Sequence, residues 1–239
     1  MRPGCRARMD SRGNTGRMKR LERLDETTLP TGAVLTLYRH DGAYLIRSDG
    51  AELMSSRHHH SEDVLADLVC TPLGDRPGAR VLIGGLGLGF TLRAALRSLP
   101  RDAVVDVVEL SDAVIRWNSN ADYDLAAREL QDPRVNVIQD DAANVIANSA
   151  ATYDGIMLDV DNGVEPVTHS HNAALYDDRG IRLALAALRP AARLAYWSAV
   201  AYPRFEAALR RTGKAVDAVP ARAHGLRGAT HYIYLVSRA

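Results

Sequence analysis

The sequence predicts an α/β protein, in which a Rossmann-like, seven-stranded, mostly parallel sheet with helices on both faces is preceded by a small antiparallel β unit. Three observations support this prediction. From residue 80 onward, apolar runs of strand length alternate with amphipathic runs of helix length. The first of these strands runs directly into a glycine-rich turn at residues 84–89. Between residues 32 and 54, short alternating runs are separated by Asp-Gly pairs typical of hairpin turns.

Composition restricts the class of protein. Of the 239 residues, 46% are hydrophobic and 25% are charged, which is ordinary for a globular domain. A net charge of +1 is not the excess of positive charge that binding to nucleic acid or to a membrane surface requires. No apolar stretch reaches the ~18 residues of a membrane span. Cys5 and Cys70 stand alone, so they indicate neither a disulfide framework nor a thiolate metal site. We expect a cytoplasmic protein with no nucleic-acid or membrane partner.

We expect the chain to divide into three parts. Residues 1–24 are rich in arginine and lack an apolar core, which predicts a disordered basic leader rather than a signal peptide; an RNA-binding arm is the alternative. Residues 25–70 would form the small β unit and a helix with Ser61 as its N-cap. Residues 71–239 would form the Rossmann-like, nucleoside-binding catalytic domain.

The expected elements follow the hydrophobic pattern along the chain. The small β unit would contain strands 33–38, 43–47 and 51–54, with turns at Asp41-Gly42 and Asp49-Gly50. The expected strands of the larger domain are 81–84, 103–110, 135–139, 155–160, 193–198, 215–219 and 231–236. The expected helices are 91–99, 111–118, 142–149, 179–188 and 204–212. The last two strands have no clear helix between them, which predicts an antiparallel edge hairpin.

The glycine-rich turn and the acid after the next strand predict a cofactor site. Glycine lets the backbone turn tightly and approach a ligand, and the helix that follows offers free N–H groups. Glu109 stands twenty residues after Gly89 at the end of the next strand, where a carboxylate can accept from both hydroxyls of a ribose. Turn chemistry with a surface acid is the alternative. The cofactor-binding glycines would be Gly84, Gly85, Gly87 and Gly89.

Acidic residues follow two further strands at the same edge of the sheet. Asp140 and Asp141 could accept from an adenine amino group, and the alternative is an N-cap for the next helix. Asp159 and Asp161 end the following strand, and an extended backbone would place both on one side. Two carboxylates in one pocket suit a cationic substrate, and their repulsion raises one pKa toward that of a general base. For Asp161, a simple turn is the alternative.

Histidines are the remaining candidates. The adjacent residues His58, His59 and His60 point in divergent directions on a helix or a strand, so they cannot all face one ion, and no metal is expected. His169 lies in a 17-residue stretch, residues 161–177, with no clear helix or strand pattern. Loops of this length are usually lids or binding loops, which favours substrate contact for His169 over metal binding.

Four stretches resemble the spermidine synthase (polyamine aminopropyltransferase) family, within the Rossmann-like S-adenosylmethionine-dependent methyltransferases. They are residues 81–89, 108–115, 132–135 and 153–159. The resemblance implies a nucleoside sulfonium co-substrate, either decarboxylated S-adenosylmethionine or S-adenosylmethionine, together with a small amine-like acceptor and a homodimer. It assigns three acids: Glu109 to the ribose, Asp141 to the adenine, and Asp159 to deprotonation of the attacking amine.

The chain departs from that family on the acceptor side. The family's catalytic acid is followed three residues later by a second Asp before Pro, and that position here is Asn162, with Asp161 as the nearest substitute. The family's acidic and aromatic segment is replaced by residues 57–62, which contain no Tyr and keep Glu62. Fewer opposite charges predict a poorer polyamine pocket. The catalytic candidates are Asp159 and Asp161, and the substrate-binding candidates are Glu62, Asn162, His169 and Tyr176.

The sequence therefore predicts a transferase that alkylates an amine acceptor with a decarboxylated S-adenosylmethionine-type sulfonium, as in aminopropyl transfer. One alternative is methyl transfer from S-adenosylmethionine. The acid-rich edge of the sheet argues against it, because the carboxylate of that cofactor needs a cationic or N–H partner. The second alternative is a non-catalytic nucleoside-binding homologue, which the missing second Asp favours.

Overall fold

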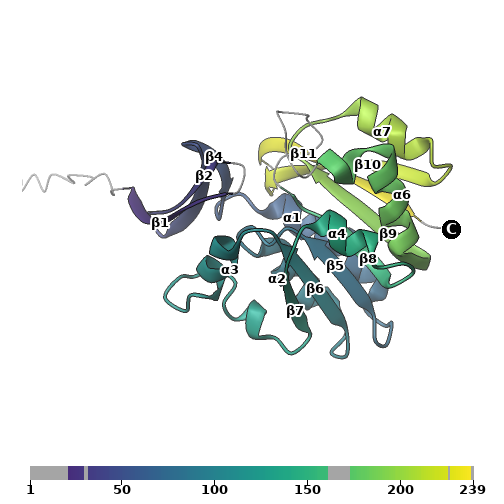
Figure 1. The fold of residues 1–239 in the computed structure, drawn as a ribbon, viewed down its shortest axis with the longest axis horizontal. Helices are drawn as coiled ribbons and strands as arrows, with labels where there is room; N and C mark the ends of the chain where they lie inside the picture. The colour runs from purple at the N-terminus through teal and green to yellow at the C-terminus, as the bar shows by residue number, and fades with distance from the viewer. Residues whose placement is uncertain (1–20, 30–31, 161–172, 226, 238–239) are drawn as a thin grey trace, which may run out of the picture.

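A computed structural model describes residues 21–29, 32–160, 173–225 and 227–237 (Figure 1). Its larger sheet has the strand order β10-β11-β9-β8-β5-β6-β7. The neighbouring pairs from β9 to β7 are parallel, whereas β11 is antiparallel to both β9 and β10. This arrangement confirms the predicted fold class and the antiparallel hairpin at one edge. The strands are β5 (Arg80–Gly84), β6 (Val104–Glu109), β7 (Val135–Gln139), β8 (Tyr153–Leu158), β9 (Leu188–Ser198), β10 (Ala215–His224) and β11 (Arg227–Ser237).

Helices cover both faces of this sheet, and the alternation of side chains along each strand explains why. On β5, Val81 and Ile83 belong to the core under α1, α2 and α3, whereas Leu82 belongs to the core under α4, α6 and α7. The first set of helices is α1 (His60–Cys70), α2 (Phe90–Ser98) and α3 (Asp112–Ser119). The second set is α4 (Ala142–Ala147), α5 (Ala173–Tyr176), α6 (Asp178–Ala187) and α7 (Pro203–Arg210). Single 3-10 turns occur at η1 (Thr71–Leu73) and η2 (Glu129–Gln131).

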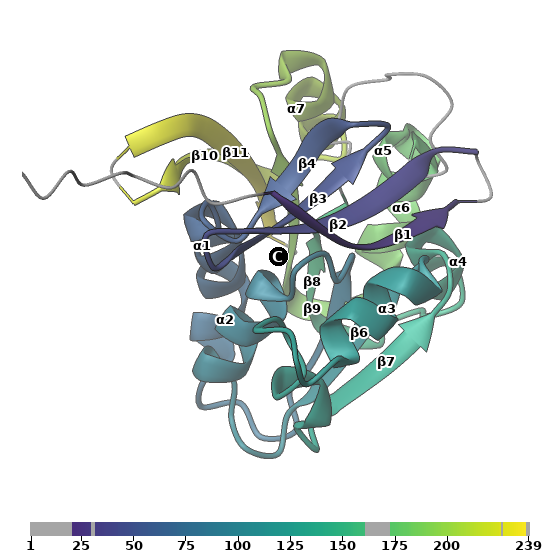
Figure 2. The same cartoon turned by 90° about the vertical axis from the view of Figure 1, so that its left-hand side faces the viewer.

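The small sheet has the order β1-β2-β3-β4 and lies against one end of the larger sheet (Figure 2). Its strands are β1 (Glu22–Thr28), β2 (Val34–His40), β3 (Ala43–Ser48) and β4 (Ala51–Ser55). Both expected turns are present: Asp41, Gly42, Asp49 and Gly50 all have positive φ, as a two-residue hairpin turn requires. Apolar residues of β2 and β3 join the same core as α1 and α2, so the two sheets are packed together.

Strand β1 is absent from the sequence-based expectation. It begins at Glu22, inside the range 1–24 expected to be a leader, and the rest of that range (residues 1–20) lies outside the described residues. Its sequence is polar because it is an edge strand whose side chains are mostly exposed. Tertiary contacts hold it: the Trp117 indole N–H donates to Asp25 at 2.7 Å, and Arg39 pairs with Glu22 at 2.9 Å.

Several predicted boundaries are corrected. Helix α1 begins at His60 with His59 as N-cap, so the prediction of Ser61 as N-cap is wrong. Leu188 was expected to end a helix and instead opens β9. The stretch 161–177 was expected to have no regular structure, but its described part contains α5. None of the helices in the described ranges is both long and apolar enough to span a membrane.

Candidate functional site

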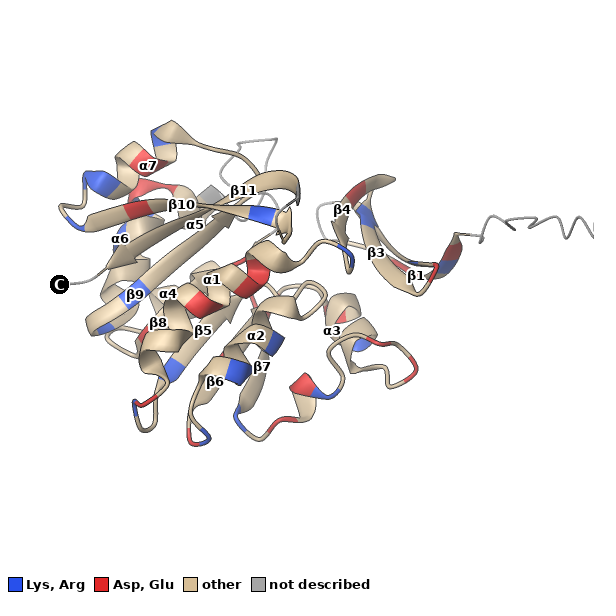
Figure 3. Cartoon of the chain, turned by 180° about the vertical axis from the view of Figure 1, so that it is seen from behind, with Lys and Arg blue, Asp and Glu red and all other residues tan. Residues whose placement is uncertain are grey.

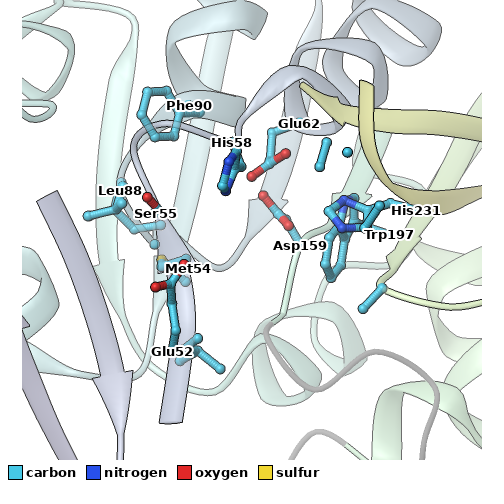
Figure 4. A pocket seen from close by; sticks show the side chains of 17 residues that line it. Glu52, Met54, Ser55, His58, Glu62, Leu88, Phe90, Asp159, Trp197 and His231 are labelled. Carbon is cyan, nitrogen blue, oxygen red and sulfur yellow. The ribbon is translucent and has the colours of Figure 1, made fainter. Parts of the chain in front are cut away.

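A cavity of about 350 Å³ opens where the small sheet meets the carboxyl ends of β5 and β8 (Figure 4). Residues of β4, the start of α1, the glycine-rich turn, β9 and the β10–β11 hairpin form its wall. Glu62 and Asp159 both line it, and so does Gly87. No lysine or arginine of the described residues lines it. Strands β5 and β8 are neighbours, but the chain passes through β6 and β7 on one side of β5 before it returns to β8 on the other. This reversal of strand order between β5 and β8 is the kind of switch point at which α/β sheets bind ligands.

The glycine-rich turn connects β5 to α2 and is shaped by its neighbours. Gly85 has a φ of +94°, and a Cβ there would overlap the carbonyl oxygen of Asp159. Gly89 has a φ of +80°, and a Cβ there would overlap the side chain of Ala126. The turn therefore needs glycine to let the ends of β5 and β8 approach each other. Ligand binding by these glycines and by Gly84 stays a prediction.

Glu109 ends β6, and its carboxylate is fixed beside the glycine-rich turn. Its Oε2 accepts from the backbone N–H of Leu86 at 2.9 Å, and its Oε1 accepts from that of Ser111 at 2.8 Å. Burial raises its pKa, and these backbone donors partly offset that effect. The backbone N–H groups of Gly87 and Leu110 also act on this carboxylate, and Glu109 does not line the cavity. Its assignment to a ribose stays a prediction.

Asp140 and Asp141 follow β7 and take different local roles. The Oδ1 of Asp141 accepts from the backbone N–H of Ala143 at 2.8 Å, which confirms the N-cap alternative for this residue. Asp140 is exposed, and its Oδ1 accepts from the side-chain amide of Asn144 at 3.2 Å. Neither residue lines the cavity. A capping Asp141 keeps its second oxygen, so its predicted contact with an adenine is compatible with the cap but stays a prediction.

Asp159 and Glu62 bring two carboxylates to the same side of the cavity (Figure 4). Asp159 follows β8, and its Oδ2 accepts from the Thr91 hydroxyl at 2.6 Å. Glu62 lies in the first turn of α1, next to Asp63. Asp63 points away from the cavity to Arg97 at 3.0 Å, and Figure 3 shows the acidic start of α1 beside the basic residues of α2. Glu62 makes no salt bridge within the described ranges.

The environment raises the pKa of both cavity carboxyl groups. Burial is the main cause for each, and the charge of Asp159 adds to it at Glu62. The pKa of Glu62 rises to about 8 and that of Asp159 to about 6, although the Thr91 hydroxyl bond opposes the change at Asp159. A raised pKa makes each carboxylate a stronger proton acceptor, so the ionised pair suits the deprotonation of a cationic amine.

A hydrogen-bonded cluster lies behind Glu62. The Ser61 Oγ is 2.5 Å from Glu62 Oε2 and 2.9 Å from His231 Nδ1, and it accepts from the Trp197 indole N–H at 3.1 Å. Burial and nearby His58 lower the pKa of His231. His58, Trp197 and His231 also line the cavity, so the cluster connects the carboxylate pair to the cavity wall.

The other predicted residues lie elsewhere or outside the described ranges. Tyr176 packs against Tyr196 and Phe205 at ring-centroid distances of 5.6 and 5.4 Å, in the core on the opposite face from α1. It does not line the cavity, and its role in substrate binding stays a prediction. Three further candidates, Asp161, Asn162 and His169, lie outside the described residues. The ranges that the structure describes contain no group of His, Cys, Asp and Glu able to hold a metal ion.

Sequence reasoning missed four side chains that define the cavity chemistry. Thr91 appears in the sequence as an ordinary helix residue, and Trp197 and His231 appear as strand residues. Ser61 has the pattern of a helix cap. The run at residues 58–60 is the available signal for a histidine in the cavity wall. The four residues are recognised only when α1, α2, β9 and β11 are packed together.

Comparisons with known proteins identify a family and relatives that match part of the chain. The family model of the spermine/spermidine synthase domain matches residues 64–196. Putrescine N-methyltransferase 4 from Nicotiana tabacum is 40% identical over 101 residues, which cover 41% of this chain and 26% of that protein. A polyamine aminopropyltransferase from Mycobacterium tuberculosis is 32% identical over 149 residues, which cover 58% of this chain and 28% of that protein. The chain thus spans less than a third of either relative.

A solved structure gives the same fold. The crystal structure of spermidine synthase in complex with the transition-state analogue AdoDATO aligns with a TM-score of 0.73 and 15% sequence identity. The alignment covers 92% of this chain and 74% of that chain. At this identity the likeness supports the architecture, including the small sheet beside the larger one.

Proposed function

Because the chain belongs to the spermine/spermidine synthase family, we propose that it transfers an aminopropyl-type group from a decarboxylated S-adenosylmethionine-type sulfonium to an amine. The observation that carries the proposal is the pair Glu62 and Asp159 in a cavity beside the glycine-rich turn. The lining has acids and no described lysine or arginine, so it attracts a cationic acceptor and offers no cationic side chain to the carboxylate of a whole methionine.

The proposed reaction needs placement and one proton acceptor. A sulfonium supplies an activated carbon, and its sulfur leaves as a thioether with the electron pair of the broken C–S bond. The carboxylate pair takes a proton from the acceptor ammonium, which frees the nitrogen lone pair to form the new C–N bond. Alignment of the two reactants supplies much of the remaining rate. Glu109 and the glycine-rich turn would hold the nucleoside, with Glu109 on the ribose and Asp141 on the adenine.

A second candidate is methyl transfer from S-adenosylmethionine to an amine. The identity of 40% to a putrescine N-methyltransferase favours it, and the same carboxylate pair would serve that chemistry. The third candidate function is that of a nucleoside-binding homologue without turnover, because position 162 is Asn rather than the second Asp of the family.

We also propose a cytoplasmic location and a homodimer. Cell fractionation would test the location, and light scattering would test the oligomeric state.

A thermal-shift titration discriminates among these functions. Decarboxylated S-adenosylmethionine, S-adenosylmethionine and methylthioadenosine are compared side by side, since a ligand at a hundred times its Kd adds about 2.7 kcal/mol to the free energy of unfolding. We expect the decarboxylated form to stabilise the chain most. Preference for the intact cofactor would move the assignment to methyl transfer, and no shift with any ligand would overturn the nucleoside site.

A matched pair of variants locates the binding. Glu109→Gln removes the charge assigned to the ribose, so it should reduce the thermal shift of every nucleoside. Glu206→Gln is the same substitution on α7, where Glu206 pairs with Arg210 at 2.7 Å outside the cavity. This control should leave the shifts unchanged. An equal shift in the Glu109 variant and the wild type would contradict the assignment of this residue.

A further inference from the structure

Ser61 joins the carboxylate pair to a histidine in the cavity wall. Its partners Glu62, Trp197 and His231 come from α1, β9 and β11, so only the tertiary fold brings them together. Ser61 is fully buried, which means that water does not compete for its hydroxyl group. The distances of 2.5, 3.1 and 2.9 Å to the three partners are all within hydrogen-bond range.

The Ser61 hydroxyl group has one proton to donate and two lone pairs, which allows two sets of hydrogen-bond directions with its partners. The Trp197 indole can only donate, so it occupies one lone pair of Oγ and leaves one lone pair and one hydroxyl proton. If Glu62 is ionised, Ser61 donates to it and accepts from the Nδ1–H of His231. If Glu62 is protonated, it donates to Ser61, and Ser61 donates to the Nδ1 of His231, whose own proton then sits on Nε2. The second arrangement holds one proton more than the first, so it becomes the first when the Nε2 proton leaves and the other protons shift along the hydrogen bonds.

We propose that Ser61 and His231 form a proton relay that carries the acceptor's proton from Glu62 to solvent. The relay rests on the proposed amine transfer and extends it. Glu62 takes the proton from the substrate ammonium, and the electron pair of that N–H bond stays on nitrogen. The Glu62 proton passes to Ser61 Oγ as the hydroxyl proton passes to His231 Nδ1, and the imidazolium releases its Nε2 proton to water. Hydroxyl rotation and exchange of the imidazole tautomer reset the chain.

The surroundings favour the first step of the relay, proton uptake by Glu62, and the last step, proton release from the imidazolium. Glu62 faces Asp159 at the end of β8 and Asp63 on its own helix, and both negative charges help it to take up a proton. His231 faces His58 from the segment before α1, and this neighbour and burial make the imidazole release a proton readily. The Trp197 ring meets the His231 ring edge-on at 4.8 Å and 71°, which holds the imidazole against Ser61. Trp197 is thus a positioning residue for the relay.

Nitrogen-15 NMR of the imidazole nitrogens tests the relay without donor or acceptor. As Glu62 loses its proton with rising pH, His231 should change from the Nε2–H to the Nδ1–H tautomer. The His231→Gln variant identifies the resonances of this imidazole by their absence. Ser61→Ala and Glu62→Gln should each abolish the tautomer change, so either variant alone tests the relay. A tautomer that is constant with pH in the wild type, or that changes equally in Ser61→Ala, would overturn the relay. Because no substrate is present, the result is independent of the proposed transfer.

Steady-state turnover is a second test of the relay, measured with the donor selected by the thermal-shift titration and with an amine acceptor. Ser61→Ala should lower kcat about 10-fold while KM is kept, since proton transfer is impaired and the cavity carboxylates remain. Ser98→Ala is the control, because Ser98 bonds Asp67 at 3.2 Å outside the cavity, and it should leave kcat unchanged. A change in KM alone would assign Ser61 to packing and contradict the relay.

Discussion

Two acids at opposite ends of β8 have opposite environments. Asp154 lies near the start of β8 and is 1% exposed. Two guanidinium groups, those of Arg76 and Arg189, each contact it at 2.8 Å, and it accepts from the backbone N–H of Arg80 at 2.9 Å. Asp159 lies directly after the other end of the strand and has the Thr91 hydroxyl as its hydrogen-bond donor. Its charged neighbour is a second carboxylate, Glu62.

The difference in charge partners separates a stabilising end of β8 from the end that faces the cavity. A charge removed from water is normally paired, and Asp154 obeys that rule by binding cations at the amino end of β8. At the carboxyl end, Asp159 and Glu62 share a cavity without such partners among the described residues. That arrangement costs stability and leaves the pair ready for a proton or a cationic substrate. The same substitution at the two ends should therefore have opposite consequences.

The largest effect should come from Asp159→Asn. An amide lacks the negative charge that attracts the acceptor ammonium and helps Glu62 to take up its proton, so turnover should fall about 100-fold or more. The free energy of unfolding should stay the same or rise, because the repulsion with Glu62 is removed. Initial rates at saturating substrate and urea unfolding measure the two quantities. Retained turnover would show that Asp159 takes no part in the proposed transfer.

Asp154→Asn, five residues earlier, should show the reverse pattern. The amide directs an N–H group toward arginines that were paired with a carboxylate, and we expect a loss of about 2 kcal/mol in the free energy of unfolding. Both arginines are partly exposed, which limits the cost. Turnover per folded molecule should be kept. If this variant instead lost turnover at unchanged stability, the division between the two ends of β8 would be wrong.

The pH dependence of the free energy of unfolding also distinguishes the two ends of β8. Glu62 and Asp159 hold their protons more strongly in the folded chain than in the unfolded chain, with pKa values of about 8 and about 6. The folded state therefore binds more protons between about pH 4 and those values, and the free energy of unfolding falls as the pH rises through this window. We expect a lower Tm at about pH 8.5 than at about pH 5.5. Asp159→Asn should reduce that difference, and Asp154→Asn, which keeps the cavity pair, should retain it.

Much of the fold could be predicted because its signals are local. The two Asp-Gly turns appear in the structure as hairpin turns with positive φ. The apolar runs that alternate with amphipathic helical runs correspond to the strands of the larger sheet. Strand β1 was not foreseen, because an exposed edge strand has no apolar pattern and depends on Trp117 and Arg39 for its place. Helix α5 has four residues, too few to give a period.

The candidate site was predicted in part for the same reason. Strand ends place Glu109 and Asp159 near the glycine-rich turn, and a parallel sheet brings its carboxyl ends to one edge. Ser61 was misassigned because a serine before an acid is a common helix start, whereas His59 occupies the cap position here.

The architecture and the sheet edge that carries the acids follow from the amino-acid sequence, because both depend on residue periods and on turns of a few positions. The tertiary structure alone decided which acids become partners. Asp159 meets Glu62 across the cavity, and Ser61 meets His231 from 170 positions away. No local pattern encodes such a contact, because it depends on how α1 packs against the ends of β8, β9 and β11.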